Sequence, residues 1–263
     1  MPRGDEVIIV ITNTPFLNTF PVDNPTQVDL YDEMIKPIKI THPEHDVWAV
    51  SDYHARHDRD FLWGKRGFKS VTEHDETLIH RWNTHLTSRS VCLNMGDFIF
   101  GDPDGYYFKA LVRRLNFAVM YLHVGNHVSG HRQVYMETLK IRFPEVASCE
   151  AAVYPLEYTV DEDPNKRVVF MPEYGEYSIG HTRLTCCHYP ILSFNHQSKQ
   201  AIHLTGHSHG GAKETNKDTG VGLRLDVGIE SFGRPVSITE IKRHLAGRTL
   251  DIRDHHSGEE ATP

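Results

Sequence analysis

Short apolar runs, each followed at once by a polar cluster, recur along the chain. Runs of this length, rich in β-branched residues, predict buried strands. The predicted strands cover residues 46–50, 91–94, 117–124, 184–187, 201–205 and 222–229. Between them, residues 151–179 alternate shorter strand-like pieces with polar turns.

Helical patterns occupy the intervals between the strands. Ser70 and Glu73 have the spacing of a capping box ahead of a helix over 71–86, and Ser237 and Glu240 repeat that spacing ahead of a helix ending near residue 246. Two more helices are expected over 106–115 and 132–142. Alternating strands and helices predict an α/β fold.

Composition shifts only near the two ends, which favours one main domain. We expect a β-rich N-terminal extension over residues 1–45, one main globular domain over 46–246 and a polar tail over 247–263.

The composition is that of a soluble globular protein of 263 residues, with 39% hydrophobic and 24% charged residues. The aliphatic run from Val7 to Ile11 is far shorter than the ~20 residues of a membrane helix, so no membrane association is expected. The four cysteines form no CxxC motif, which favours a reducing, cytoplasmic location. The net charge of −7 gives no general reason to bind nucleic acid.

The polar clusters at the strand ends are rich in metal-ligating residue types. They contain Asp52 and His54, Asp97, Asn126 and His127, His188, and His207 and His209. Ligands of α/β sheets bind beyond the carboxyl ends of the strands, so these clusters are expected to converge. The donors are nitrogen and oxygen without thiolate, which suits Mn, Fe, Ni, Co or Zn. The other histidines are expected to be structural or solvent-exposed.

The ordered set of clusters resembles the calcineurin-like metallophosphoesterase superfamily. It comprises Asp52-x-His54, Gly96-Asp97, Gly125-Asn126-His127, His188 and Gly206-His207-x-His209. The resemblance runs from about residue 46 to 246 and is closest to the small phage and bacterial subgroup. That subgroup is matched by His57, by residues 68–71 leading to 78–83, by Gly96-Asp-Phe98 and by Arg234-Pro-Val-Ser237.

The resemblance implies a fold, a metal centre and a reaction. The fold is a two-sheet αββα sandwich with helices outside. One divalent ion, most simply Mn, is held by Asp52, His54, Asp97 and His209, and a second is held by Asp97, Asn126, His188 and His207. Asp97 thus bridges the two ions. A hydroxide activated by the two metals attacks a phosphodiester or phosphomonoester, and His127 contacts the phosphate and assists the leaving group.

Two positions depart from the family pattern. Val128 replaces the acidic residue that usually follows Gly-Asn-His and orients the histidine. Arg56 replaces the subgroup's glycine between the first two histidines, where it either clamps a phosphate oxygen or narrows the mouth of the site. Both Arg56 and His57 are therefore candidate substrate contacts.

Other functions are compatible with parts of the sequence. A small phosphate ester is the preferred substrate, because a nuclease needs a basic strip and the chain is acidic. A metal-binding scaffold without turnover is a second alternative. Gly206-His-Ser208-His-Gly210 also matches a serine-hydrolase elbow, but the polar residues 212–222 do not predict the helix that such an elbow requires. The pattern leaves the oligomeric state open.

Overall fold

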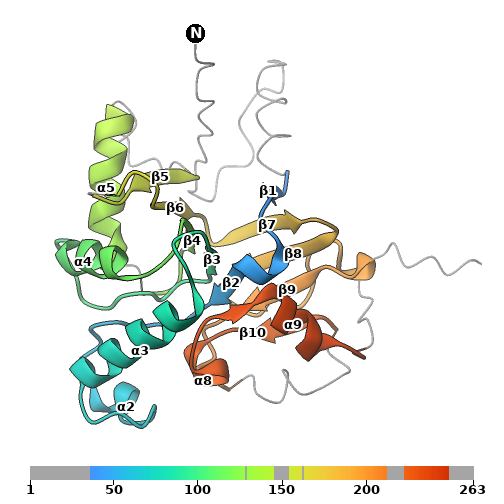
Figure 1. The fold of residues 1–263 in the computed structure, drawn as a ribbon, viewed down its shortest axis with the longest axis horizontal. Helices are drawn as coiled ribbons and strands as arrows, with labels where there is room; N and C mark the ends of the chain where they lie inside the picture. The colour runs from blue at the N-terminus through green and yellow to red at the C-terminus, as the bar shows by residue number, and fades with distance from the viewer. Residues whose placement is uncertain (1–35, 128, 145–153, 162, 212–221, 249–263) are drawn as a thin grey trace, which may run out of the picture.

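Two β-sheets pack face to face and carry most of the fold (Figure 1). The computed structural model describes residues 36–127, 129–144, 154–161, 163–211 and 222–248. One sheet has six strands in the order β11-β2-β3-β4-β6-β5, and the other has five in the order β1-β7-β8-β9-β10. The expected α/β class and two-sheet arrangement are confirmed.

The six-stranded sheet has a parallel centre. Strands β2, β3, β4 and β6 run parallel, whereas the edge strands β5 and β11 run antiparallel to their neighbours. The bounds are β2 Val47–Val50, β3 Val91–Asn94, β4 Val119–His123, β5 Leu156–Thr159, β6 Arg167–Met171 and β11 Val236–Ser237.

The five-stranded sheet is mixed. Strands β8, β9 and β10 are parallel, β7 is antiparallel to β8, and β1 is parallel to β7. The bounds are β1 Ile38–Ile40, β7 Tyr174–Ile179, β8 Thr182–Cys187, β9 Ile202–Thr205 and β10 Arg224–Asp226.

Three helices cover the outer face of the six-stranded sheet (Figure 1). They are α3 Val71–His85, α4 Tyr106–Arg114 and α5 Ser129–Arg142. The remaining helical segments are α2 Asp60–Trp63, α8 Ile229–Phe232, α9 Ile238–Leu245 and the 3-10 turns Glu44–Asp46 and Gln197–Lys199.

The alternation of side chains along the central strands produces two separate cores. On β2, Val47 and Ala49 face the five-stranded sheet, and Val50 faces the helices. The core between the sheets also receives Ile238, Ile241 and Leu245 from α9. Because both faces of the central strands are buried, these strands are almost continuously apolar, with polar residues only at their ends, as parallel strands typically are.

The predicted elements are present, with differences at their ends. The strand expected over 117–124 is β4, which starts two residues later. The strand expected over 222–229 ends at Asp226, because the Asp226 carboxylate accepts a hydrogen bond from Gly228 N (2.7 Å) and the chain turns into α8.

The start of the domain also differs from the expected boundary at residue 46. Strand β1, within the stretch assigned to an N-terminal extension, pairs with β7 and is part of the sandwich. Residues 1–35 and 249–263, which hold most of the expected extension and tail, lie outside the described residues.

The two expected capping boxes differ. Ser237 and Glu240 form the reciprocal pair at the start of α9. At α3, Ser70 accepts from Glu73 N (3.1 Å), but the Glu73 carboxylate accepts from Lys69 N (2.7 Å) rather than from Ser70 N. The predicted start of α3 is therefore confirmed, but the Glu73 side chain bonds to the residue before the N-cap instead of to the N-cap itself.

Among the helices of the described residues, none combines the length and the apolar character that a membrane crossing requires.

Three histidines outside the strand-end clusters are buried in the cores. Burial lowers the pKa of His123, His131 and His203 from 6.5 to about 4 each. The ring of His131 stacks on Phe170 with centroids 6.0 Å apart, and its Nδ1 has no hydrogen-bond partner among the described residues. His131 is therefore held as a neutral, nearly apolar ring.

We expect stability to fall as the pH drops from about 6.5 to 4. In this window the unfolded chain binds protons at these histidines and the folded chain does not, so protonation favours unfolding. The substitution His131→Phe should reduce the pH-dependent loss by up to about 3 kcal/mol. Urea unfolding at pH 7 and pH 4.5 measures this loss, with exposed His80→Gln as a control that should behave like the unsubstituted protein. An equal loss in His131→Phe would contradict the assignment.

Candidate metal centre

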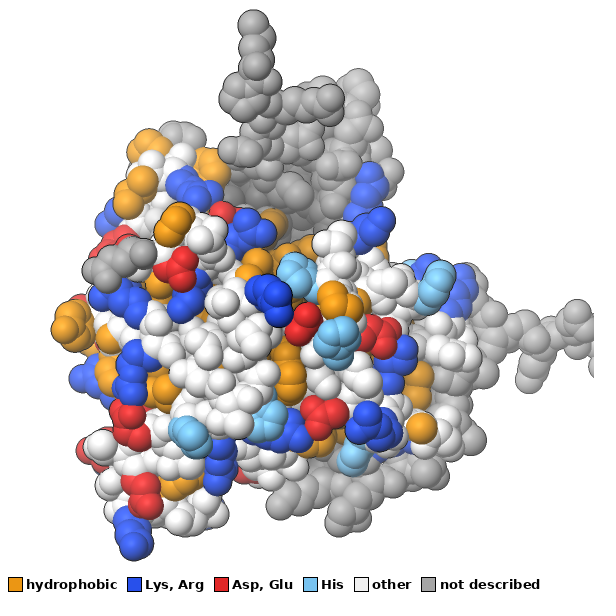
Figure 2. Space-filling model, in the orientation of Figure 1, with side chains coloured by type: hydrophobic (Ala, Val, Ile, Leu, Met, Phe, Trp, Pro, Cys, Tyr) orange, Lys and Arg blue, Asp and Glu red, His pale blue; other side chains and the backbone are white. Residues whose placement is uncertain are grey.

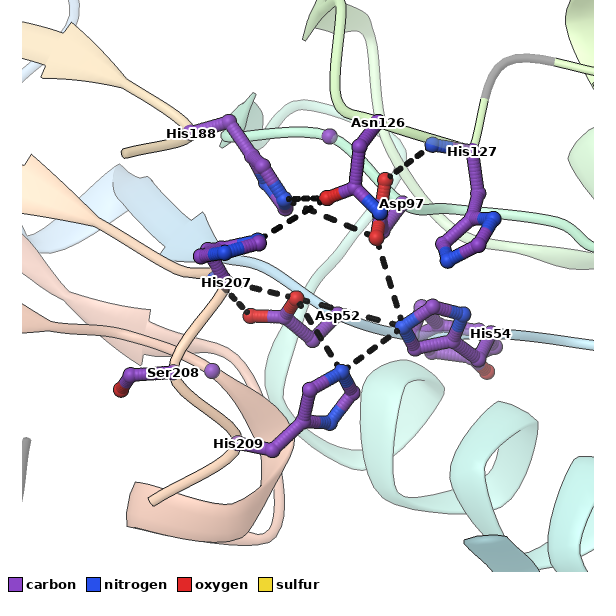
Figure 3. Close-up of polar contacts among 12 residues, drawn as sticks. Asp52, His54, Asp97, Asn126, His127, His188, His207, Ser208 and His209 are labelled. Carbon is purple, nitrogen blue, oxygen red and sulfur yellow. Dashed lines mark hydrogen bonds and ion pairs between the residues drawn. The ribbon is translucent and has the colours of Figure 1, made fainter. Parts of the chain in front are cut away.

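The structure brings all seven predicted ligands together at one edge of the sandwich (Figure 3). Each lies in a loop that follows a strand. The loops after β2, β3 and β4 come from the six-stranded sheet, and those after β8 and β9 come from the five-stranded sheet. The carboxyl ends of these strands therefore meet where the two sheets face each other, as the strand-end clusters predicted.

Two imidazoles and one carboxylate form the first group of donors. The Nε2 atoms of His54 and His209 are 3.2 Å apart. The Oδ1 atom of Asp52 lies 4.0 Å from the first and 3.9 Å from the second. Two nitrogens that each lie about 2.1 Å from one ion would be roughly 3 Å apart, so this spacing fits shared coordination.

A second group of donors lies on the other side of Asp97. The Nε2 atom of His188 is 2.8 Å from Asn126 Oδ1, and Nδ1 of His207 is 2.9 Å from that same oxygen. Asp97 Oδ2 is 3.5 Å from His188 Nε2 and also 3.5 Å from His54 Nε2. A single carboxylate oxygen therefore lies between the two groups.

Hydrogen bonds behind the rings fix which nitrogen faces the centre. His188 Nδ1 lies 3.1 Å from Met95 O, and because a carbonyl only accepts, this nitrogen carries the proton. The lone pair of a neutral His188 is then on Nε2, among the donors. Likewise His209 Nδ1 donates to Glu230 Oε1 (2.8 Å), which leaves its Nε2 facing His54.

Glu230 is itself held by a buried arginine. Arg66 donates to Glu230 Oε1 from Nε (2.9 Å) and from a terminal nitrogen (2.6 Å). It also donates to the backbone oxygens of Asp52 and Tyr53. Burial alone would raise the pKa of Glu230, but the bonds from His209 and Arg66 lower it to about 2. Arg66 thereby joins the α8 end of the site to the loop after β2.

Glycines make room for the carboxylates. A Cβ at Gly125 would lie 2.2 Å from Asp97 Oδ1, and a Cβ at Gly206 would lie 2.5 Å from Asp52 Oδ2. Any side chain at these positions would displace a carboxylate. Steric room for the two carboxylates therefore explains why glycine stands directly before Asn126 and directly before His207.

The ligand loops are strained. Asp52, His54, Asp97, His207 and His209 all have φ between 46° and 69°. This left-handed conformation costs about 1–2 kcal/mol for residues other than glycine. It is held by bonds between loops, among them His54 N to Asp97 O (2.9 Å) and His207 N to Asp52 Oδ2 (3.0 Å). Strain of this kind is typical of functional sites.

The electrostatics fit a cation. Burial, reinforced by Asp226, Glu230 and Asp97 against the opposing effect of His209, raises the pKa of Asp52 to about 7. Burial lowers the pKa of His54 and of His188, so both imidazoles are neutral and can offer a lone pair. Two buried carboxylates beside the neutral imidazoles of His54 and His188 are the chemistry of a divalent metal site.

The remaining predicted site residues occupy different positions. His127 donates its backbone N–H to Asp97 Oδ1 (2.8 Å), and its ring lies 5.5 Å from that of His54. The ring of His57 lies 5.6 Å from that of His54. Val128, the departure beside His127, lies outside the described residues.

Arg56 does not reach the donors. Its guanidinium donates to Gly101 O (2.7 Å) and lies 3.5 Å from the buried carboxylate of Asp102. That carboxylate accepts N–H groups from the first turn of α4, those of Tyr107 and Phe108. Arg56 thus makes a structural contact at the start of α4, where Asp102 offers a near anion, and its roles in binding phosphate or narrowing the mouth of the site stay predictions.

Ser208 points away from the donors (Figure 3), and its hydroxyl hydrogen-bonds to the carboxylate of Asp226. A hydroxyl that donates to a carboxylate and points away from the site gives no support to a serine nucleophile.

Sequence reasoning missed Glu230 and Arg66. Glu230 follows a predicted strand just as the ligands do, so the strand-end pattern offered a signal for it. Arg66 lies in a short polar stretch between α2 and α3 and offered none, because only tertiary packing buries it.

Comparisons with known proteins add little. No protein-family model and no curated protein matches the sequence. A solved structure of a protein of unknown function from Aquifex aeolicus, AQ665, aligns with a TM-score of 0.48 at 15% identity, covering 75% of this chain and 97% of that one. The function is therefore argued from the chain's own residues.

Glu230 gives a test of the metal centre. We expect Glu230→Gln to weaken Mn²⁺ binding by about 10-fold or more, because the amide orients His209 less strongly than a carboxylate does. Titration calorimetry measures the affinity. Glu76→Gln, which removes an exposed ion pair with Arg114, is the matched control and should bind as before. An unchanged affinity in Glu230→Gln would show that His209 is not a ligand held in this way.

Proposed function

We propose that the protein is a metal-dependent phosphoesterase of the calcineurin-like type. The observation that carries this proposal is the position of Asp97 Oδ2, 3.5 Å from a nitrogen of each donor group. One carboxylate oxygen between two sets of donors is the arrangement of a two-metal hydrolase, and the two-sheet α/β sandwich is compatible with that family's αββα fold.

The chain provides a full set of ligands for two ions. Asp52, His54, Asp97 and His209 would hold one, and Asp97, Asn126, His188 and His207 would hold the other. Mn²⁺ fits these donors, as do Fe, Zn, Ni and Co. When bound, such ions polarise a phosphoryl oxygen and lower the pKa of water.

His127 is the residue in place to move a proton. Its backbone N–H is fixed on the bridging carboxylate, so the imidazole is held at the rim of the donors beside His54 (Figure 3). The ring of Phe100 packs edge-on at 5.3 Å and limits its rotation. An imidazole in this position would protonate the departing oxygen of the ester.

A small ester is the favoured substrate. On the face shown in Figure 2, lysine and arginine are interspersed with acidic and neutral side chains and form no continuous strip. The whole chain carries a charge of −7. A polynucleotide backbone would require a basic track of several phosphate contacts.

We expect Asp97→Asn to bind fewer Mn²⁺ ions and to hydrolyse bis(p-nitrophenyl) phosphate at least about 100-fold more slowly, because the bridging charge is lost. Metal analysis after gel filtration and initial rates measure the two effects. Asp104→Asn, an exposed carboxylate at the start of α4, is the control. Turnover retained in Asp97→Asn would refute the bridging role, and metal binding without turnover in the unsubstituted protein would favour a non-catalytic scaffold.

We expect His127→Ala to keep its bound metal and to lose about 10²–10⁴-fold in kcat, as removal of a general acid does. The loss should be larger for an alkyl leaving group than for p-nitrophenolate, which departs readily without a proton. Exposed His45→Ala is the control. Loss of metal from His127→Ala would instead identify His127 as a ligand.

A further inference from the structure

A cavity adjoins the metal centre. It has a volume of about 660 Å³, and His209 and Glu230 form the wall that it shares with the centre. The other walls come from α2, from the segment between α2 and α3, from α3 and from α8 with the residue after it. Cavities of this size hold small organic molecules and are much larger than a phosphate group requires.

The walls of this cavity are aromatic. Phe61, Phe68 and Phe232 line it, with Leu62 and Ile229 beside them. The side chain of Phe61 is 56% exposed, although burial of an aromatic ring is favourable. The cavity thus presents flat apolar surfaces to a ligand.

The charge of the cavity is opposite to that of the protein. Its lining holds three cationic side chains, Lys65, Arg66 and Arg81, and a single carboxylate, Glu230. Arg66 and His209 already pair with that carboxylate. Lys65 makes no ion pair with any described residue. Arg81 lies over the ring of Phe68 at 5.8 Å and donates to Gly233 O. An anion in the cavity would meet excess positive charge.

A continuous line of rings connects the cavity to the donors. The ring of Phe61 is 5.5 Å from that of His57, which is 5.6 Å from that of His54. His57 also packs on Phe100, whose ring contacts His127. The rings of His57 and Phe100 therefore lie between the cavity wall at Phe61 and the donor-side residues His54 and His127.

We propose that this cavity binds the nucleoside part of a nucleotide phosphodiester, so that the substrate of the proposed phosphoesterase is a nucleotide ester. This inference rests on the proposed function. Nucleobases stack on aromatic side chains whatever their sequence, and a neighbouring arginine or lysine adds a cation–π contact to the base and attracts the anionic ester toward this end of the site.

Two esters with the same leaving group test the proposal. Thymidine 5′-(p-nitrophenyl phosphate) and methyl p-nitrophenyl phosphate both release p-nitrophenolate, so a difference in kcat/KM reports on the other substituent. The Mn-loaded protein should prefer the thymidine ester by about 10-fold or more, as expected for one stacked base. Phe61→Ala and Lys65→Ala should each lower this preference. Tyr106→Ala and Lys140→Ala, exposed positions on α4 and α5, should keep it.

The outcomes distinguish failure of the nucleoside site from failure of the proposed phosphoesterase function. Equal kcat/KM for the two esters, with both activities lost in Asp97→Asn, would overturn the nucleoside site and leave the phosphoesterase standing. If neither ester is hydrolysed, the proposed function fails. Calorimetry with thymidine 5′-monophosphate then decides the cavity, because binding that Phe61→Ala weakens at least about 10-fold supports a nucleotide site and absence of binding refutes it.

Discussion

Two buried carboxylates, Asp52 and Asp97, determine how the loops of this protein fit together. Asp52 accepts the N–H of His207 from the opposite sheet, and Asp97 accepts the N–H of His127 from the next loop. Each carboxylate therefore joins two loops before any ion is considered. Buried charge is unfavourable unless it is compensated. The strained loops and the glycines hold the two carboxylates close together, an arrangement that a bound cation would compensate.

The two sheets have unequal roles at this site. The six-stranded sheet supplies both carboxylates, Asn126 and one imidazole, His54, whereas the five-stranded sheet supplies only imidazoles, those of His188, His207 and His209. The side chains between the sheets, such as Leu93, Leu204 and Leu225, set the distance across which these donors meet. A protein interior packs too densely to absorb large changes in volume, so the core indirectly fixes the separation of the donors.

Arg66 connects the metal centre to the adjoining cavity. Its guanidinium bonds to Glu230 on one side and to the backbone of Asp52 and Tyr53 on the other. The same residue lines the cavity with the aromatic walls. The proposed site for the organic group and the proposed site for the phosphate thus share one rigid boundary, formed by His209, Glu230 and Arg66. Movement of α8 would alter both together.

The sequence by itself determined the order of elements and the ligand types. Apolar runs located the strands, and the polar residue directly after each strand marked the site, because parallel strands deliver their ends to one edge. Tertiary structure alone decided the partners of side chains that leave no local pattern. Arg56 turned to Asp102 rather than to the donors, Arg66 became buried beneath Glu230, and β1 joined the sheet ahead of the expected boundary. Such contacts join residues far apart in the chain, and periodicity records only which face of its own element a residue occupies.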